Sequence, residues 1–112
     1  MSALSHDIIK SLRNATGDVF HEIINIYIND ALSIINEMES LIQGNNIEQL
    51  RHLVHTLKGS SRNVGALKIA DLCAAFEAIL KSALPCDTKH HARIIRLAYE
   101  ETLPLLESYI VN

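Results

Sequence analysis

His55, Lys58 and Gly59 lie within about one turn of each other in a segment whose apolar residues recur with helical spacing. In a helix these three residues share a face with Arg51 and Arg62, while the leucines and valines of the segment point to the other side. A glycine inside a helix costs about 1 kcal/mol relative to alanine, and neighbouring cations repel one another. Packing does not explain these residue types, so their explanation is chemical.

The three side chains suit the acceptance of a phosphoryl group. A cation at Lys58 favours the neutral imidazole of His55, whose free nitrogen lone pair is nucleophilic near pH 7. The same cation lies where a negatively charged group attached to His55 would sit. Gly59 removes side-chain bulk, so that another protein surface can approach the imidazole. This combination favours phosphoryl acceptance over metal binding or acyl chemistry.

Two segments resemble motifs of histidine-containing phosphotransfer (HPt) domains. Residues 55–66, HTLKGSSRNVGA, are similar to the HxLKGSSxxxGA signature of that family. Residues 72–77, LCAAFE, resemble its LCxxLE motif, with Phe76 in place of the usual leucine. Within the first motif, Ser60 and Ser61 look like small residues that allow close helix packing.

The resemblance implies a role for each residue of the site. His55 would be phosphorylated through Nε2, Lys58 would neutralise the phosphoryl charge, and Gly59 would give access. Glu77 would hydrogen-bond the other ring nitrogen and fix its orientation, although a surface carboxylate explains Glu77 equally well. Which ring nitrogen carries the proton is not determined by the sequence.

The resemblance also implies the partners. The phosphoryl donor would be the phospho-aspartate of a receiver domain, the acceptor would be another response-regulator receiver, and a sensor histidine kinase would act upstream. We expect partner contacts from four residues around the histidine: Arg51, His52, Ser60 and Arg62. The chain has no glycine-rich phosphate loop and no aspartate cluster, so we expect no kinase or phosphatase activity and no cofactor of its own, with Mg²⁺ supplied by the receiver. We expect a cytoplasmic monomer, either free or as the C-terminal HPt domain of a hybrid sensor kinase at the inner membrane.

The elements that must position these residues are helices, because no period-two alternation or hairpin turn occurs in the sequence. Apolar residues recur instead at intervals of three and four. The predicted helices cover residues 3–13, 20–44, 47–64, 67–83 and 88 onward. We therefore predict an all-α fold, an antiparallel four-helix bundle with a short additional N-terminal helix as a lid, in a single domain of residues 1–112.

Several residues predict where these helices begin and end. Ser5 is a candidate N-cap, Gly44 a left-handed terminator, and Asn45 or Asn46 the cap of the third helix. Asp87 or Thr88 opens the last helix, within which Pro104 predicts a kink or a break. The predicted buried stripe of the third helix includes Ile47. That of the last helix includes Ile94, Ile95, Ala98, Leu105 and Tyr109.

Composition excludes several classes of protein. Hydrophobic residues make up 48% and charged residues 21% of 112 residues, as in ordinary globular domains. A net charge of −3 without tryptophan argues against nucleic-acid binding, and no apolar run is long enough to span a bilayer. Cys73 and Cys86 form no CxxC pair and are expected to be free thiols.

Two other functions fit parts of the sequence. A metal-binding bundle could use His52 and His55 with Glu48 or Glu77, but the paired Glu-x-x-His motifs of carboxylate-bridged bundles are missing. A docking module with an inactive histidine would leave Lys58 and Gly59 without a purpose. The segment 19–28 has more apolar residues than one stripe needs, and part of that surplus could meet a partner.

Overall fold

The computed structural model describes residues 2–44 and 46–110, and within these ranges it contains helices and no strand. The helices are α1 (His6–Thr16), α2 (Phe20–Leu41), α3 (Ile47–Val64), α4 (Leu67–Lys81) and α5 (Thr88–Glu107), with a 3₁₀ turn, η1 (Gly17–Val19), between the first two. The prediction of an all-α fold is confirmed.

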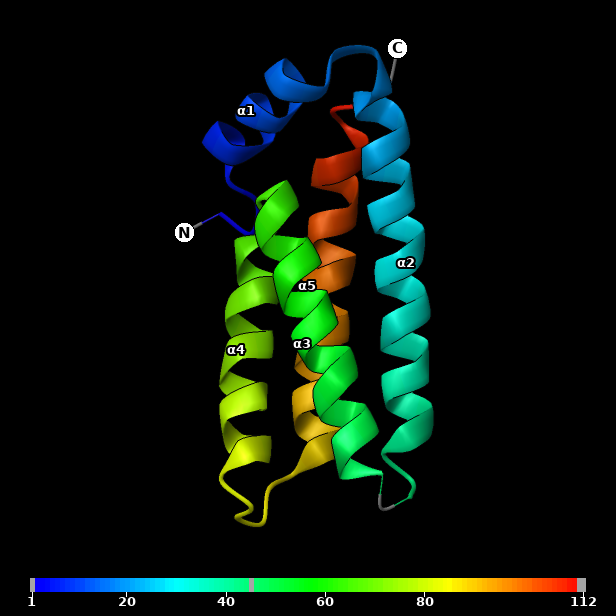
Figure 1. Cartoon of the computed structure of the whole chain (residues 1–112), viewed down its shortest axis with the longest axis vertical. Helices are drawn as coiled ribbons and strands as arrows, with labels where there is room; N and C mark the ends of the chain where they lie inside the picture. The colour runs from blue at the N-terminus through cyan, green and yellow to red at the C-terminus, as the bar shows by residue number, and fades with distance from the viewer. Residues whose placement is uncertain (1, 45, 111–112) are drawn as a thin grey trace.

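The four long helices run alternately up and down the long axis of the molecule, and α1 lies across one end (Figure 1). The molecule measures 44 × 24 × 20 Å. α3 contacts both α2 and α4, and α5 contacts the same two helices from the other side, which closes the bundle. α1 packs on α2 and α3. The predicted antiparallel bundle with an N-terminal lid is therefore confirmed.

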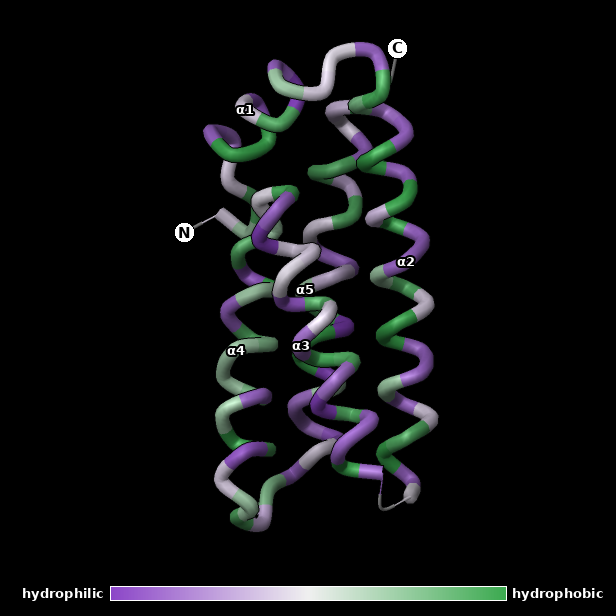
Figure 2. The backbone as a smooth tube through the Cα atoms, in the orientation of Figure 1, coloured by the Kyte–Doolittle hydropathy of each residue, from purple (hydrophilic) through white to green (hydrophobic). Residues whose placement is uncertain are grey.

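The core lies between the four long helices, each of which alternates apolar and polar residues along its length (Figure 2). Its fully buried side chains include Ile24 and Ile35 of α2, Leu57 of α3, Ile69 of α4 and Ile95 of α5. Burying one side chain of this size contributes about 1.5–3 kcal/mol. The core thereby fixes the rotation of α3 and α4 about their axes, and with it the side chains that these helices present to solvent.

The lid helix is attached at the turn between α3 and α4. This turn consists of Gly65 and Ala66, and Gly65 has a left-handed φ of 83°. The Ser5 N–H donates to the Gly65 carbonyl at 2.8 Å, and the Ser5 hydroxyl accepts from the N–H of Ile8, which caps α1 as predicted. A Cβ on Gly65 would lie 3.0 Å from the Ser5 carbonyl oxygen, so only glycine allows this approach.

Four predicted helix ends differ from the structure, both ends of α1 and the C-terminal ends of α2 and α4. α1 covers residues 6–16 rather than 3–13, because the chain before the Ser5 cap is buried against the bundle. Gly44 is not left-handed, since α2 ends at Leu41 and a turn with the Gly44 N–H on the Leu41 carbonyl follows. Asn46 occupies the N-cap position of α3, but its side chain makes no capping hydrogen bond. Asn45 lies outside the described residues.

The proline in the last helix does not break it. α5 continues through Pro104 to Glu107, so a break was the wrong prediction. Proline removes the hydrogen bond to the carbonyl four residues earlier, and here that residue, Glu100, is exposed to water. The Asp87 side chain caps α5 by accepting from the His90 N–H, as predicted. α4 ends at Lys81, two residues before the predicted end.

The buried faces of α3 and α5 also differ in part from the predicted stripes. Ile47 is 44% exposed and lines a surface groove with Leu84. On α5, Ile95 and Ala98 are buried as predicted, whereas Ile94, Leu105 and Tyr109 are only half-buried. The remaining buried positions of α5 are Ala92, Tyr99, Thr102 and Leu106. Two of these side chains are polar, and they are buried because their hydroxyls donate to the carbonyls of Ile28 and Ala98.

Candidate functional site

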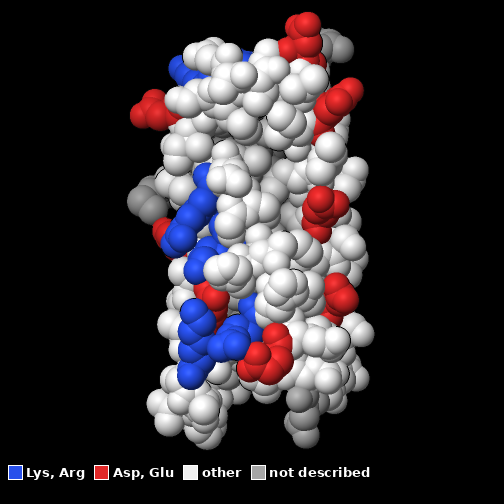
Figure 3. All heavy atoms as spheres, viewed as in Figure 1, with Lys and Arg blue, Asp and Glu red and all other residues white. Residues whose placement is uncertain are grey.

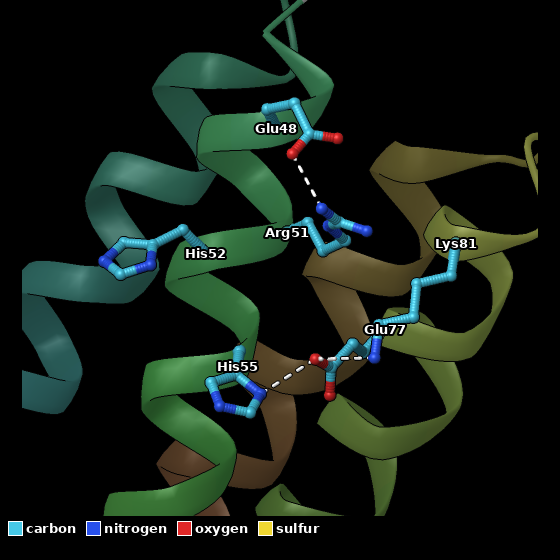
Figure 4. Close-up of a pocket in the computed structure, with 6 residues that line it drawn as sticks. All are labelled: Glu48, Arg51, His52, His55, Glu77 and Lys81. Carbon is cyan, nitrogen blue, oxygen red and sulfur yellow. Dashed lines mark hydrogen bonds and ion pairs between the residues drawn. The ribbon is translucent and has the colours of Figure 1, made fainter.

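His55 lies in the middle of α3 and points out of the bundle, with 63% of its side chain exposed. Its Nδ1 is 2.8 Å from Oε2 of Glu77, which comes from the neighbouring helix α4 (Figure 4). The contact that the resemblance implied between these two residues is therefore present. It leaves the other ring nitrogen, Nε2, without a partner among the described residues.

Glu77 is buried, although the sequence was equally consistent with an exposed carboxylate on the surface. Its side chain is only 6% exposed, and its Oε1 accepts from Nζ of Lys58 at 2.5 Å. Nζ of Lys81, one turn further along α4, is 3.5 Å from Oε2. The hydrogen bond from Lys58, followed by that from His55, lowers the pKa of Glu77 to about 2 although burial acts in the opposite direction. Glu77 is therefore ionised at neutral pH.

The ionised carboxylate determines how the imidazole is arranged. An ionised Glu77 can only accept hydrogen bonds, so a neutral His55 ring must carry its proton on Nδ1. The lone pair is then on Nε2, the nitrogen that faces solvent. A nucleophilic nitrogen is thus fixed in direction by a buried anion on the next helix.

A cavity of about 350 Å³ opens beside the imidazole. Its lining comes from α3 and α4, and consists of Glu48, Arg51, His52, His55, Glu77 and Lys81. Lysine and arginine side chains gather over these two helices, whereas acidic side chains follow α2 (Figure 3). The cavity therefore combines the candidate nucleophile with two cations, Arg51 and Lys81, and with the carboxylates of Glu48 and Glu77 to which these cations are paired.

The structure brings together some of the predicted site residues and separates others. Arg51 and His52 lie beside His55 in the cavity, and Arg51 is also bound to Glu48 at 2.7 Å. Lys58 donates to Oε1 of Glu77, the oxygen that His55 does not contact, and is not among the residues that line the cavity. Arg62, although on the same helix, is not part of the lining.

Two small residues of the motif differ in their surroundings. Ser60 is half-buried, and its hydroxyl donates to the carbonyl of Leu57 at 3.2 Å. Ser61 is fully buried, and its Oγ is 2.6 Å from the hydroxyl of Tyr27 on α2. Gly59 is exposed, and a Cβ at this position would meet no atom within 4 Å apart from its own helix backbone. Ser61 therefore packs α3 on α2, while Gly59 leaves open space beside the histidine.

Lys81 is the cavity residue that sequence reasoning missed. It follows Glu77 by four residues, so the two share one face of α4. That spacing could have identified it, but only once Glu77 was known to face His55. The surplus of apolar residues in the segment 19–28 was anticipated only as a group. Val19 of η1 and Ile26 of α2 are 47% and 58% exposed, whereas Ile28 packs against the core.

Other predictions concern the chemistry of the chain as a whole. Cys73 and Cys86 are free, as expected. In residues 2–44 and 46–110, no three histidine, cysteine or acidic side chains come together in a way that could hold a metal ion. Within the same ranges, no helix is both long and apolar enough to cross a membrane.

The fold and the site together define a class of protein, the small antiparallel helical bundle that presents one exposed histidine held by a carboxylate from the next helix. The sequence model of the Hpt domain matches residues 22–107, and the chain belongs to this family.

Similar proteins are found among both sequences and structures. Histidine-containing phosphotransfer protein 5 of Arabidopsis thaliana is 35% identical over 65 residues, which are 55% of this chain and 41% of that protein. Histidine-containing phosphotransfer protein 2 of Oryza sativa subsp. japonica is 39% identical over 57 residues, 49% of this chain and 38% of that protein. The matches thus span about two fifths of the length of these curated relatives.

The fold is shared with a solved structure at lower sequence identity. The crystal structure of histidine-containing phosphotransfer protein B from Pseudomonas aeruginosa PAO1 superposes with a TM-score of 0.91 at 18% identity, over 96% of this chain and 94% of that one. The bundle and its lid are therefore an arrangement that very different sequences adopt.

Proposed function

We propose that this chain is a phosphorelay intermediate that accepts a phosphoryl group on His55 from the phospho-aspartate of a receiver domain and passes it to another receiver. The observation that carries the proposal is the imidazole itself, exposed at Nε2 and held at Nδ1 by the buried anion Glu77. Membership of the Hpt family and the names of its phosphotransfer relatives support the same function.

The transfer is a displacement at phosphorus in which the histidine acts as the nucleophile. The Nε2 lone pair of His55 attacks the phosphorus, a new N–P bond forms, and the P–O bond to the aspartyl oxygen breaks. The electron pair of that bond leaves with the aspartate, which becomes a carboxylate. The ring retains its Nδ1 proton and becomes positively charged, and the hydrogen bond to ionised Glu77 stabilises that charge. The reverse sequence delivers the group to the next receiver.

The proposal assigns the remaining machinery to the partners. Hpt phosphotransfer proteins are carriers rather than classical enzymes. The sequence contains no glycine-rich phosphate loop, so we assign no kinase or phosphatase activity to this chain. The receiver would supply Mg²⁺ and the aspartate, a sensor histidine kinase would supply the phosphoryl group, and the exchange would take place in the cytoplasm.

Phosphoryl transfer from a labelled phospho-receiver in the presence of Mg²⁺ tests the proposal. The wild-type chain and His55→Gln are compared, and the label is then exposed to acid and to alkali. The expected result is a label on the wild type alone that acid removes and alkali leaves in place, as for a phosphorus–nitrogen bond to histidine. If several receivers leave no label, or if His55→Gln is labelled equally, His55 is not the acceptor and a docking module becomes the better explanation.

A further inference from the structure

The charged residues of α5 are divided by sign between the two halves of the helix. Every lysine and arginine of α5 precedes Leu97, and every carboxylate follows it. The cations are Lys89, Arg93 and Arg96, and the carboxylates are Glu100, Glu101 and Glu107. Leu97 itself is 52% exposed, so an apolar side chain lies on the surface between the two groups of charges.

This order of charges opposes the dipole of the helix. A helix is stabilised by carboxylates in its first turn and by cations in its last turn. α1 follows this order, with Asp7 in its first turn and Arg13 in its last. α5 has no acidic residue in its first turn, where Lys89 lies, and no basic residue in its last turn, which ends at Glu107. The stability of the helix therefore does not account for the charges of α5.

Contacts within the bundle use only part of this charge. Arg96 is paired with Glu39 of α2, and Glu101 is paired with Lys68 of α4, each at 2.6 Å. Within residues 2–44 and 46–110, the four other charged residues of α5 are exposed and take part in no ion pair: Lys89, Arg93, Glu100 and Glu107. Their charges are available to another molecule.

These four side chains share one face of α5 with Leu97. They are separated from Leu97 by three, four, eight and ten residues, and all these separations return to the same side of a helix. Leu32 of α2 is 37% exposed and lies one turn from Asn36, whose side chain accepts from Arg96. Leu32 therefore adds a second apolar side chain at the edge of the same face.

We propose that this face, formed by Lys89, Arg93, Leu97, Glu100 and Glu107, binds a second copy of the chain about a two-fold axis near Leu97. Two-fold symmetry makes the two α5 helices antiparallel, and each contact then occurs twice. Leu97 meets its own counterpart, Arg93 meets Glu100 of the other copy, and Lys89 comes within reach of Glu107. The face is thus complementary to itself, whereas a partner with charge of one sign would suit only half of it.

A dimer of this kind leaves both histidines accessible. α3 and α5 occupy diagonal positions in the bundle, because each contacts α2 and α4 and, in the described part of the chain, they do not contact each other (Figure 1). The outer face of α5 is therefore turned away from α3, which carries His55. The dimer does not depend on the proposed function. The expectation of a monomer came from the resemblance to the family, whereas the dimer is inferred from the charges of this chain.

Analytical ultracentrifugation of the whole chain, from about 10 µM to about 1 mM protein in low salt, measures the association. The wild type is expected to show a monomer–dimer equilibrium that weakens as salt is raised to about 1 M, where screening limits charge attraction to about 3 Å. Arg93→Glu and Glu100→Arg should each weaken dimerisation about tenfold, because two attractive pairs become repulsive. Leu97→Lys should also weaken it. Lys10→Glu on α1 makes the same change of charge as Arg93→Glu, at another exposed position, and should match the wild type.

Combining the two charge reversals tests the antiparallel arrangement. In an equimolar mixture of Arg93→Glu and Glu100→Arg, position 93 of each variant faces an opposite charge at position 100 of the other, so a heterodimer should form. The double variant Arg93→Glu/Glu100→Arg should dimerise as the wild type does. All the altered side chains are exposed, so the far-UV circular dichroism of the variants should be unchanged.

Three results would overturn the proposal. A wild type that stays monomeric at about 1 mM in low salt would leave this face of α5 for a different protein. A dimer that persists in Leu97→Lys and in both charge reversals would form through another surface, such as the one that contains the exposed Val19 and Ile26. A double variant that stays monomeric would exclude the antiparallel pairing of the two helices.

Discussion

Replacing Gly59 with alanine should make the protein more stable. Gly59 is inside α3, and an added Cβ would meet no atom within 4 Å beyond the helix's own backbone, so the substitution introduces no clash. Removing a glycine from a helix interior gains about 1 kcal/mol. With an unfolding entropy of about 2.1 cal/mol/K for each of the 112 residues, that gain raises Tm by about 4 °C.

Thermal and urea unfolding of Gly59→Ala measure this gain, and the urea m-value should stay constant. Gly65→Ala is the matched control, since Gly65 has a φ of 83° and its added Cβ would lie 3.0 Å from the Ser5 carbonyl oxygen. It should lose at least about 1–2 kcal/mol from the left-handed backbone alone. If Gly59→Ala is instead less stable than the wild type, the fold itself requires this glycine and the reasoning about partner access is refuted.

Two further predictions concern other residues of the site and the core. Glu77→Gln should remove a pH-dependent part of the stability: the pKa of Glu77 is lowered from 4.5 to about 2, so the wild type loses stability as the pH falls through that interval. Urea unfolding across this range should show a smaller loss in Glu77→Gln, and parallel curves would contradict the prediction. Ser61→Ala should cost about 1–3 kcal/mol, because it leaves the buried hydroxyl of Tyr27 unpaired. Ser60→Ala, at a half-buried position, is its control in the same urea assay, and equal effects would be the contradicting result.

The sequence predicted the features that depend on helical periodicity. The four long helices, their antiparallel order and the lid all follow from apolar spacing and short connections. Helix ends were predicted less well. Gly44 was expected to end its helix in a left-handed conformation, but a turn without a left-handed residue follows α2 instead. The face of α5 was misjudged because Tyr99 and Thr102 are buried through hydrogen bonds that periodicity does not reveal.

Only the site residues that lie together on one helix could be grouped from the sequence. His55, Lys58 and Gly59 lie on α3, so their spacing alone places them together. The burial of Glu77 and the position of Lys81 depend on the rotation of α4 against α3, which the whole core determines. For the same reason the sequence showed Lys58 as a free cation, whereas the structure pairs it with Glu77.

The short connection between α3 and α4 keeps the histidine and its carboxylate partner in one part of the chain, apart from the exposed apolar surface. His55 and Glu77 stand on two helices joined by only Gly65 and Ala66, so the reactive pair belongs to a single helical hairpin. The exposed apolar side chains Val19 and Ile26 lie outside that hairpin. Substitutions at these two side chains would leave the geometry of the His55–Glu77 pair unchanged, so the exposed apolar surface and the pair can vary independently in related sequences.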